Sequence, residues 1–196
     1  MQMSEEQEAA SVTSYAYKAS LIGSAHRFEL TDEGLSWRIA GRSGLWRYGE
    51  IAAVRLSFRP VSMQQQRFRA DISHAGGGRI AVLSTTWQTA ALMAAQNQAY
   101  RDFIVELHAR MAKAGSRATL TAGLGRTTHM AALALLAMLA VAMAGLFVRA
   151  LTSGEFAGAL FIIGFAVLFT WQIGGFVRRN QPQSYSFDRL PMSVLP

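Results

Sequence analysis

Two long runs without charged side chains dominate the C-terminal third of the chain. Residues 130–148 contain no polar side chain, and residues 156–177 are interrupted only by Thr170 and Gln172. As helices these runs would be about 28 and 33 Å long, close to the roughly 30 Å hydrocarbon core of a bilayer. A buried helix of a soluble protein is the alternative, but two adjacent runs of this length favour membrane spans. The pattern therefore predicts a hairpin of two transmembrane helices.

A second pattern, in which apolar and polar residues alternate, covers residues 27–84. Such alternation is typical of half-buried antiparallel strands. The clearest apolar positions are Val54, Leu56, Phe58, Phe68, Ala70 and Ile72. Turn-forming residues separate the strands at 32–34, 41–44 and 76–78. About six or seven short strands are expected, in a small barrel or sandwich.

The apolar spacing then becomes helical between residues 86 and 114, a segment without glycine or proline. The apolar positions are Tyr100, Phe103, Ile104, Leu107 and Met111. We expect the hydroxyl residues at 84–86 to cap the start of this helix and Gly115 to end it. Glu106 and Arg110 are spaced to form an i,i+4 ion pair. The apolar stripe, including Phe103 and Leu107, should be buried against the strands, and His108 should lie on the surface.

The order of these elements and a loose motif resemble bacterial pleckstrin-homology-like (PH-like) domains. The motif comprises an LTDEGL-type hairpin at residues 30–35 and the WRYGEI step at 46–51, which leads into a strand at 54–58. The resemblance covers about residues 14–115 and implies an α+β fold, a small antiparallel barrel or sandwich closed by a C-terminal helix. It implies a scaffold that binds protein, peptide or lipid, without catalysis. The basic signature for inositol phosphates is not evident, because Lys18 is the only lysine before Lys113.

The expected organisation has five parts, and the last of them has two interpretations. The parts are a flexible acidic N-terminus (1–13), the PH-like domain (14–116), a juxtamembrane linker (117–129), the hairpin (130–177) and a proline-containing tail (178–196). Three of the four prolines lie in the tail, interspersed with apolar residues. The tail is therefore either a disordered terminus or an extended segment that fills pockets on a protein surface.

Basic residues flank the hairpin unequally. Lys113, Arg117 and Arg126 precede it and Arg178, Arg179 and Arg189 follow it, whereas Arg149 is the only basic residue of the short connection. Because cytoplasmic loops carry the excess of lysine and arginine, both termini are expected in the cytoplasm and the protein in the inner membrane. Ala137, Ala140 and Ala144 share one face of the first span. Small residues of this kind allow close helix contact, with another membrane protein or with a second copy.

The candidate binding residues are arginines of the predicted sheet. Residues 36–81 contain eight arginines and two acids, within a chain of net charge +7. We expect Arg55, Arg59, Arg67 and Arg69 to share the outward face of neighbouring strands, where they could contact anionic lipid head groups or a partner. A merely solvated sheet face is the alternative. Nucleic acid is not expected, because no aromatic stacking platform accompanies the charges.

No residue pattern indicates catalysis, a metal or a cofactor. Cysteine is absent, and the four histidines are far apart without metal-ligand spacing. The glycine-containing segment 123–128 lacks the first glycine and the lysine of a phosphate-binding loop. The sequence thus favours a non-enzymatic membrane protein whose PH-like domain binds protein or anionic lipid. The alternative is an accessory subunit that packs into a larger membrane complex through its hairpin.

Overall fold

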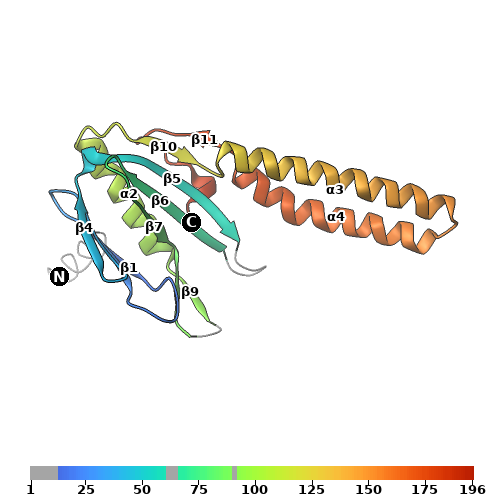
Figure 1. Cartoon of the computed structure of the whole chain (residues 1–196), viewed down its shortest axis with the longest axis horizontal. Coiled ribbons are helices and arrows are strands. Elements are labelled where there is room, and N and C mark those ends of the chain that lie inside the picture. Colours follow the sequence, from blue (N-terminus) through green and yellow to red (C-terminus); the bar gives the residue numbers. More distant parts are fainter. Residues whose placement is uncertain (1–12, 61–65, 90–91) are drawn as a thin grey trace. The chain divides into compact units, whose positions relative to one another are not determined.

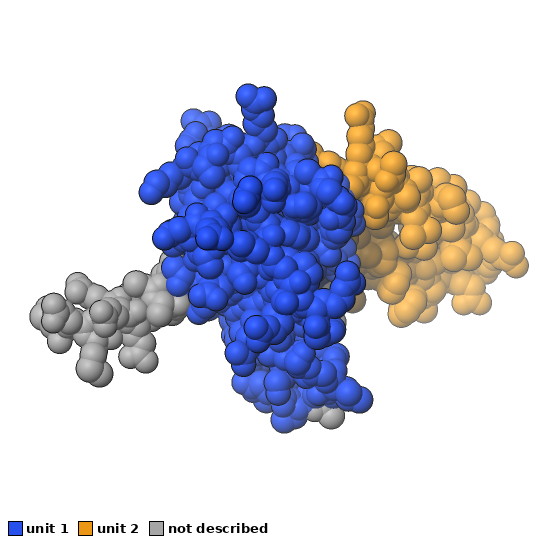
Figure 2. Space-filling model, turned by 60° about the vertical axis from the view of Figure 1, so that its left-hand side comes forward, with its two compact units in different colours: residues 1–123, 183–196 blue, residues 124–182 orange. Residues whose placement is uncertain are grey.

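The computed structural model describes residues 13–60, 66–89 and 92–196. These residues form two compact units (Figure 2). Unit 1 comprises Met1–Gly123 together with Gln183–Pro196, and unit 2 comprises Leu124–Pro182. The chain therefore leaves unit 1, forms unit 2 and returns to unit 1.

Unit 1 is an α+β unit built on sheets that are not closed into a barrel (Figure 1). The first sheet joins β1 (Ser14–Tyr17), β2 (His26–Leu30), β3 (Leu35–Ile39) and β4 (Arg42–Trp46) in sequence order. The second has the order β11-β10-β5-β6-β7, from β5 (Ile51–Pro60), β6 (Gln66–His74), β7 (Arg79–Leu83), β10 (Thr119–Ala122) and β11 (Gln183–Ser184). A short helix, η1 (Tyr48–Glu50), links the two sheets. All their strand pairs are antiparallel except β10 with β5. The α+β class is confirmed, but the sheets remain open.

The core of unit 1 follows the two apolar patterns of the sequence. On β5, Val54, Leu56 and Phe58 are at most 5% exposed, and their partners on β6 are equally buried. Helix α2 (Asn97–Lys113) buries its stripe completely, including Phe103 and Leu107, as the spacing predicted. Phe103 contacts Tyr15 of β1 and so joins the helix to the first sheet.

Helix α2 begins eleven residues later than the sequence suggested, because the expected capping residues belong to the sheets. Residues 85–87 form β8 (Thr85–Trp87), which pairs with β9 (Met93–Ala95). Ser84 is fully buried, and its hydroxyl accepts a hydrogen bond from the Phe68 backbone N–H at 2.9 Å. That hydroxyl is therefore committed to β6 and does not cap the helix.

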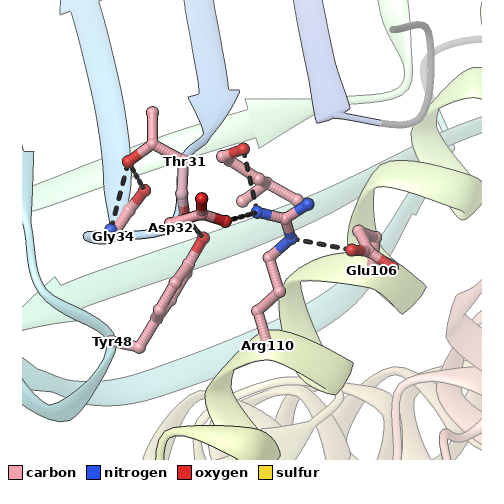
Figure 3. A network of polar contacts seen from close by, with 7 residues as sticks. Thr31, Asp32, Gly34, Tyr48, Glu106 and Arg110 are labelled. Carbon is pink, nitrogen blue, oxygen red and sulfur yellow. Dashed lines mark hydrogen bonds and ion pairs between the residues drawn. The ribbon is translucent and has the colours of Figure 1, made fainter. Parts of the chain in front are cut away.

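Arg110 fixes the other half of α2 against the turn between β2 and β3 (Figure 3). Its guanidinium donates to Glu106 at 2.7 Å, which confirms the predicted pair, and to the Leu30 carbonyl at 3.1 Å. Asp32 lies 3.8 Å away across the turn. Tyr48 closes the network by donating to the Thr31 carbonyl at 2.7 Å. A hydrogen bond from a charged group typically contributes about 1.5–3 kcal/mol, so Arg110 is a substantial tie between helix and sheet.

Unit 2 is a hairpin of two helices, α3 (Arg126–Thr152) and α4 (Phe156–Arg179) (Figure 1). Both are long and apolar enough to cross a membrane, and within the described residues their most apolar stretches are not buried inside the structure. A core helix of a soluble protein would be mostly buried, so the exposed apolar surface agrees with the membrane interpretation.

The segments on either side of the hairpin are both part of unit 1. The expected linker at 117–129 contains β10, which pairs with β5, and the tail supplies β11, which pairs with β10. The tail then ends in a short helix, η2 (Met192–Val194), which packs against β5. Val194 is fully buried and Leu195 is 5% exposed. Of the two interpretations of the tail, the disordered one is wrong, because its apolar residues fill a surface of the chain's own domain.

If the tail is part of the core, Val194→Asp should destabilise unit 1, because it buries a charge without a partner. Burying an unpaired charge or creating a core defect typically costs about 3–5 kcal/mol. The matched control is Met192→Asp, because Met192 is 66% exposed two residues away. Urea unfolding of the detergent-solubilised full chain, followed by tryptophan fluorescence, measures both. Equal midpoints for the two variants would contradict the packing of the tail.

Candidate binding surface

The register of β5 and β6 places the four candidate arginines on one face of the second sheet. Arg59 lies opposite Arg67, Ser57 opposite Arg69, and Arg55 opposite Asp71. Directly opposed residues of an antiparallel pair point to the same side. The buried apolar residues occupy the other side, so this arginine face points away from the core.

Two of the four arginines are engaged within the protein. Arg69 donates bidentately to Asp71, with nitrogen–oxygen distances of 2.6–3.0 Å. The pair is partly shielded, with 30% of the Arg69 and 13% of the Asp71 side chain exposed, and the carboxylate raises the pKa of Arg69. Bidentate geometry makes this a strong local pair, and it cancels one positive charge of the face.

Arg67 holds the β8–β9 hairpin against β6. Its Nε donates to the Thr85 hydroxyl at 2.9 Å, and its Nη2 lies 3.0 Å from the Met93 sulfur. Partial burial lowers the pKa of Arg67, and the positive charges of Arg69 and Arg59 act in the same direction. A guanidinium that is half-buried and already hydrogen-bonded has fewer donors left for a ligand.

The remaining charges of the face are exposed. Arg55 and Arg59 on β5 are exposed, and Arg79 on β7 joins them, because it is paired with Ser73 on the outward side of β6. Within the described part of the chain, none of these three makes an ion pair or a side-chain hydrogen bond. Arg79 was not singled out from the sequence, although its alternation with buried Ile80 and Val82 carried the signal. The accessible cations are thus Arg55, Arg59 and Arg79, supplemented by Arg67.

A buried polar pair lies elsewhere in unit 1, where α2 meets the tail. His108, expected on the surface, is only 1% exposed. Its Nδ1–H donates to the Ile104 carbonyl at 2.7 Å, so its Nε2 accepts from the Tyr185 hydroxyl at 2.9 Å. Phe187 also packs on the imidazole. The surface prediction is wrong because the helix pattern alone could not show that the tail covers this side of α2.

Within the described ranges, no group of three or more His, Asp or Glu side chains is placed to hold a metal ion. The arginine face presents guanidinium donors, and the Asp71 carboxylate on it is bound to Arg69. Such an arrangement can bind an anion by charge and hydrogen bonds.

Comparison of the chain with protein-family models, with curated proteins and with solved structures gave no match. The likeness to PH-like domains therefore rests on the sequence motif and on the order of strands and helix.

The His108–Tyr185 contact should make unit 1 sensitive to acid. Burial lowers the pKa of His108 below its usual value of about 6.5. The unfolded chain then binds a proton before the folded one does, so stability should fall as the pH drops through about 6.5. His108→Gln should flatten this loss between about pH 7 and 5.5, measured by urea unfolding of the full chain at several pH values.

His26 provides the matched comparison for this experiment. Burial lowers the pKa of His26 as well, and its ring contacts Tyr17 on the first sheet instead of the tail. A His26→Gln variant should therefore retain the His108 part of the acid sensitivity. If His108→Gln leaves the slope of stability against pH unchanged, the imidazole is not held neutral in the folded state.

Proposed function

We propose that this chain is a non-enzymatic protein of the cytoplasmic membrane whose N-terminal domain is PH-like and binds anionic lipid head groups at the inner leaflet. The observation that carries the proposal is the arginine face. Among the described residues, it presents Arg55, Arg59 and Arg79 exposed and without an ion pair, while the carboxylate of Asp71 is bound to Arg69. The described part of this face is therefore basic where it meets solvent.

Modest contacts suffice for such a domain if the hairpin lies in the same membrane. Each arginine near an anionic bilayer surface contributes about 1 kcal/mol, so three give a weak affinity on their own. Tethering converts binding into an intramolecular step at an effective concentration in the millimolar range for short linkers. A weak intrinsic affinity of the domain for anionic lipid is then sufficient to hold it on the membrane surface.

The inferred orientation places both termini in the cytoplasm. Residues just before and just after the hairpin pair directly, Thr121 with Ser184 and Ala122 with Gln183. This pairing supports an arrangement in which both flanks lie on one side of the membrane. The excess of lysine and arginine on those flanks favours the cytoplasmic side.

Because the chain contains no cysteine, single-cysteine variants can test this orientation. Ser153→Cys lies in the connection between the spans and Ser193→Cys in the tail, and both positions are exposed. On intact cells a membrane-impermeant maleimide should label Ser153→Cys only. Ser193→Cys should react after the membrane is permeabilised. Labelling of Ser193→Cys on intact cells would reverse the orientation.

The lipid proposal is testable on unit 1 alone if the hairpin is replaced by a turn. Since Ala122 and Gln183 are paired, an Asn-Gly turn in place of residues 123–182 should join β10 to β11 directly. This domain should float with vesicles that contain phosphatidylglycerol and not with pure phosphatidylcholine. Salt should weaken the binding, because the Debye length falls from about 10 Å at 0.1 M to about 3 Å at 1 M.

Arg55→Gln combined with Arg59→Gln should lose about 2 kcal/mol, a factor of about thirty in affinity. The matched control is the double change of Arg38 and Arg42 to glutamine, which removes the same net charge from exposed positions on β3 and β4. Equal losses for the two pairs would show that net charge alone attracts the domain. A domain that ignores acidic vesicles at low salt would favour protein binding instead.

A further inference from the structure

Helices α3 and α4 leave a large apolar groove between them. Its volume is about 580 Å³, within the range of about 300–1,000 Å³ that is usual for ligand sites. The two helices face each other along half-buried stripes, such as Leu139 and Met143 on α3 and Ile162 and Ala166 on α4. Within the described residues of the hairpin helices only Ala159 is fully buried, and the groove beside this contact remains open.

Small residues leave room for the groove, and larger apolar side chains form its sides. Ala140 and Ala144 line the groove on α3, and Gly174 lines it on α4, with Phe147 and Phe169 beside them. A Cβ added to Gly174 would have no neighbour within 4 Å. The groove thus has room for a slender apolar chain along the helices.

One charged side chain, Arg178, lines the groove near the end of α4. Among the described residues, its guanidinium makes no ion pair or side-chain hydrogen bond. The single acid of the two helices and their connection, Glu155, lies at the opposite end of the hairpin. A guanidinium at the edge of the hydrocarbon region is costly unless an anion or water satisfies it. The site therefore combines an apolar channel with an unmatched cation at one end.

Charge decides between the occupants that fit an apolar groove. A second copy inserted in the same orientation would bring its own Arg178 and Arg179 to the same end of the hairpin, where like charges repel. An anionic phospholipid places a phosphate next to Arg178 and an acyl chain along the groove. Basic pockets between transmembrane helices on the cytoplasmic side are a known setting for acidic lipids.

We infer that the hairpin binds one anionic phospholipid, with an acyl chain in the groove and the phosphate on Arg178. This site is separate from the arginine face and rests on the proposed membrane location. The acyl chain would cover the apolar side chains that line the groove beside the contact of α3 with α4.

Native mass spectrometry of the detergent-solubilised full chain tests the inference. The probes are phosphatidylglycerol and phosphatidylcholine with identical acyl chains. One phosphatidylglycerol should be retained in preference. Arg178→Gln should reduce that preference about fivefold, as expected for the loss of one contact of about 1 kcal/mol. Arg179→Gln is the charge-matched control and should retain the preference.

The groove itself is tested by a pair of glycine variants. Gly174→Leu places a side chain in the groove and should reduce retention of both lipids. Gly164→Leu is the control, because an added Cβ there also meets nothing within 4 Å and the residue does not line the groove. At neither position would the added Cβ clash with the backbone, so the hairpin should form in both variants.

Three results would overturn the inference and leave the membrane location intact. Equal retention of the two lipids would remove the role of Arg178, and equal effects of the two leucine variants would remove the groove. A dimer that Gly174→Leu dissociates would show that a second copy occupies it. Recovery of the chain in the aqueous fraction without detergent would instead overturn the membrane location, and the lipid site with it.

Discussion

The pairing of β10 with both β5 and β11 is the constraint on which the rest of the structure depends. Strand β10 leads into the hairpin, and β11 receives the chain directly after it. The two strands bond to each other, so the ends of the hairpin must meet. Two apolar helices satisfy this requirement, whereas one or three membrane crossings would place β10 and β11 on opposite sides of a bilayer. The strand pairing of unit 1 therefore requires an even number of membrane crossings between β10 and β11.

Local patterns in the sequence were sufficient for the central strands, the body of α2 and the two apolar helices, but not for β8, β9, β10 and β11. Long-range contacts were not visible in these patterns. The alternation around Val54 correctly predicted the buried face of β5, and the stripe around Phe103 correctly predicted the buried face of α2. The late start of α2 was missed because serine is a common helix-capping residue, so the sequence around Ser84 resembled a helix start. In the structure the Ser84 hydroxyl instead accepts a hydrogen bond from Phe68 of β6, sixteen residues away. The burial of His108 was missed because its partner, Tyr185, lies 77 residues further along, beyond both apolar helices.

The arginine face shows the same limit for the candidate site. Period two placed Arg55, Arg59, Arg67 and Arg69 on one side, which the register bears out. It could not show which of them remain available. Arg69 and Asp71 are two residues apart on one strand, so their pairing was open to prediction, whereas the bond from Arg67 to Thr85 depends on where β8 folds back. The alternation along a strand thus predicts which side of the sheet an arginine side chain points to. Whether that side chain is free to bind a ligand depends on contacts with distant parts of the chain.

The width of the hairpin groove has a comparable origin. Within the described part of unit 2, half-buried stripes of α3 and α4 face each other, so side chains set the separation of the helices along their length. At the end that carries Arg178, the backbone does so as well: the Leu124 N–H donates to the Asn180 carbonyl at 3.0 Å, and β10 and β11 pair immediately beyond. The short connection around Gly154, whose φ is +75°, holds the other end. Between these ends the small residues Ala140, Ala144 and Gly174 leave the groove beside the helix contact unfilled. The proposed lipid can therefore occupy the groove without any separation of the helices.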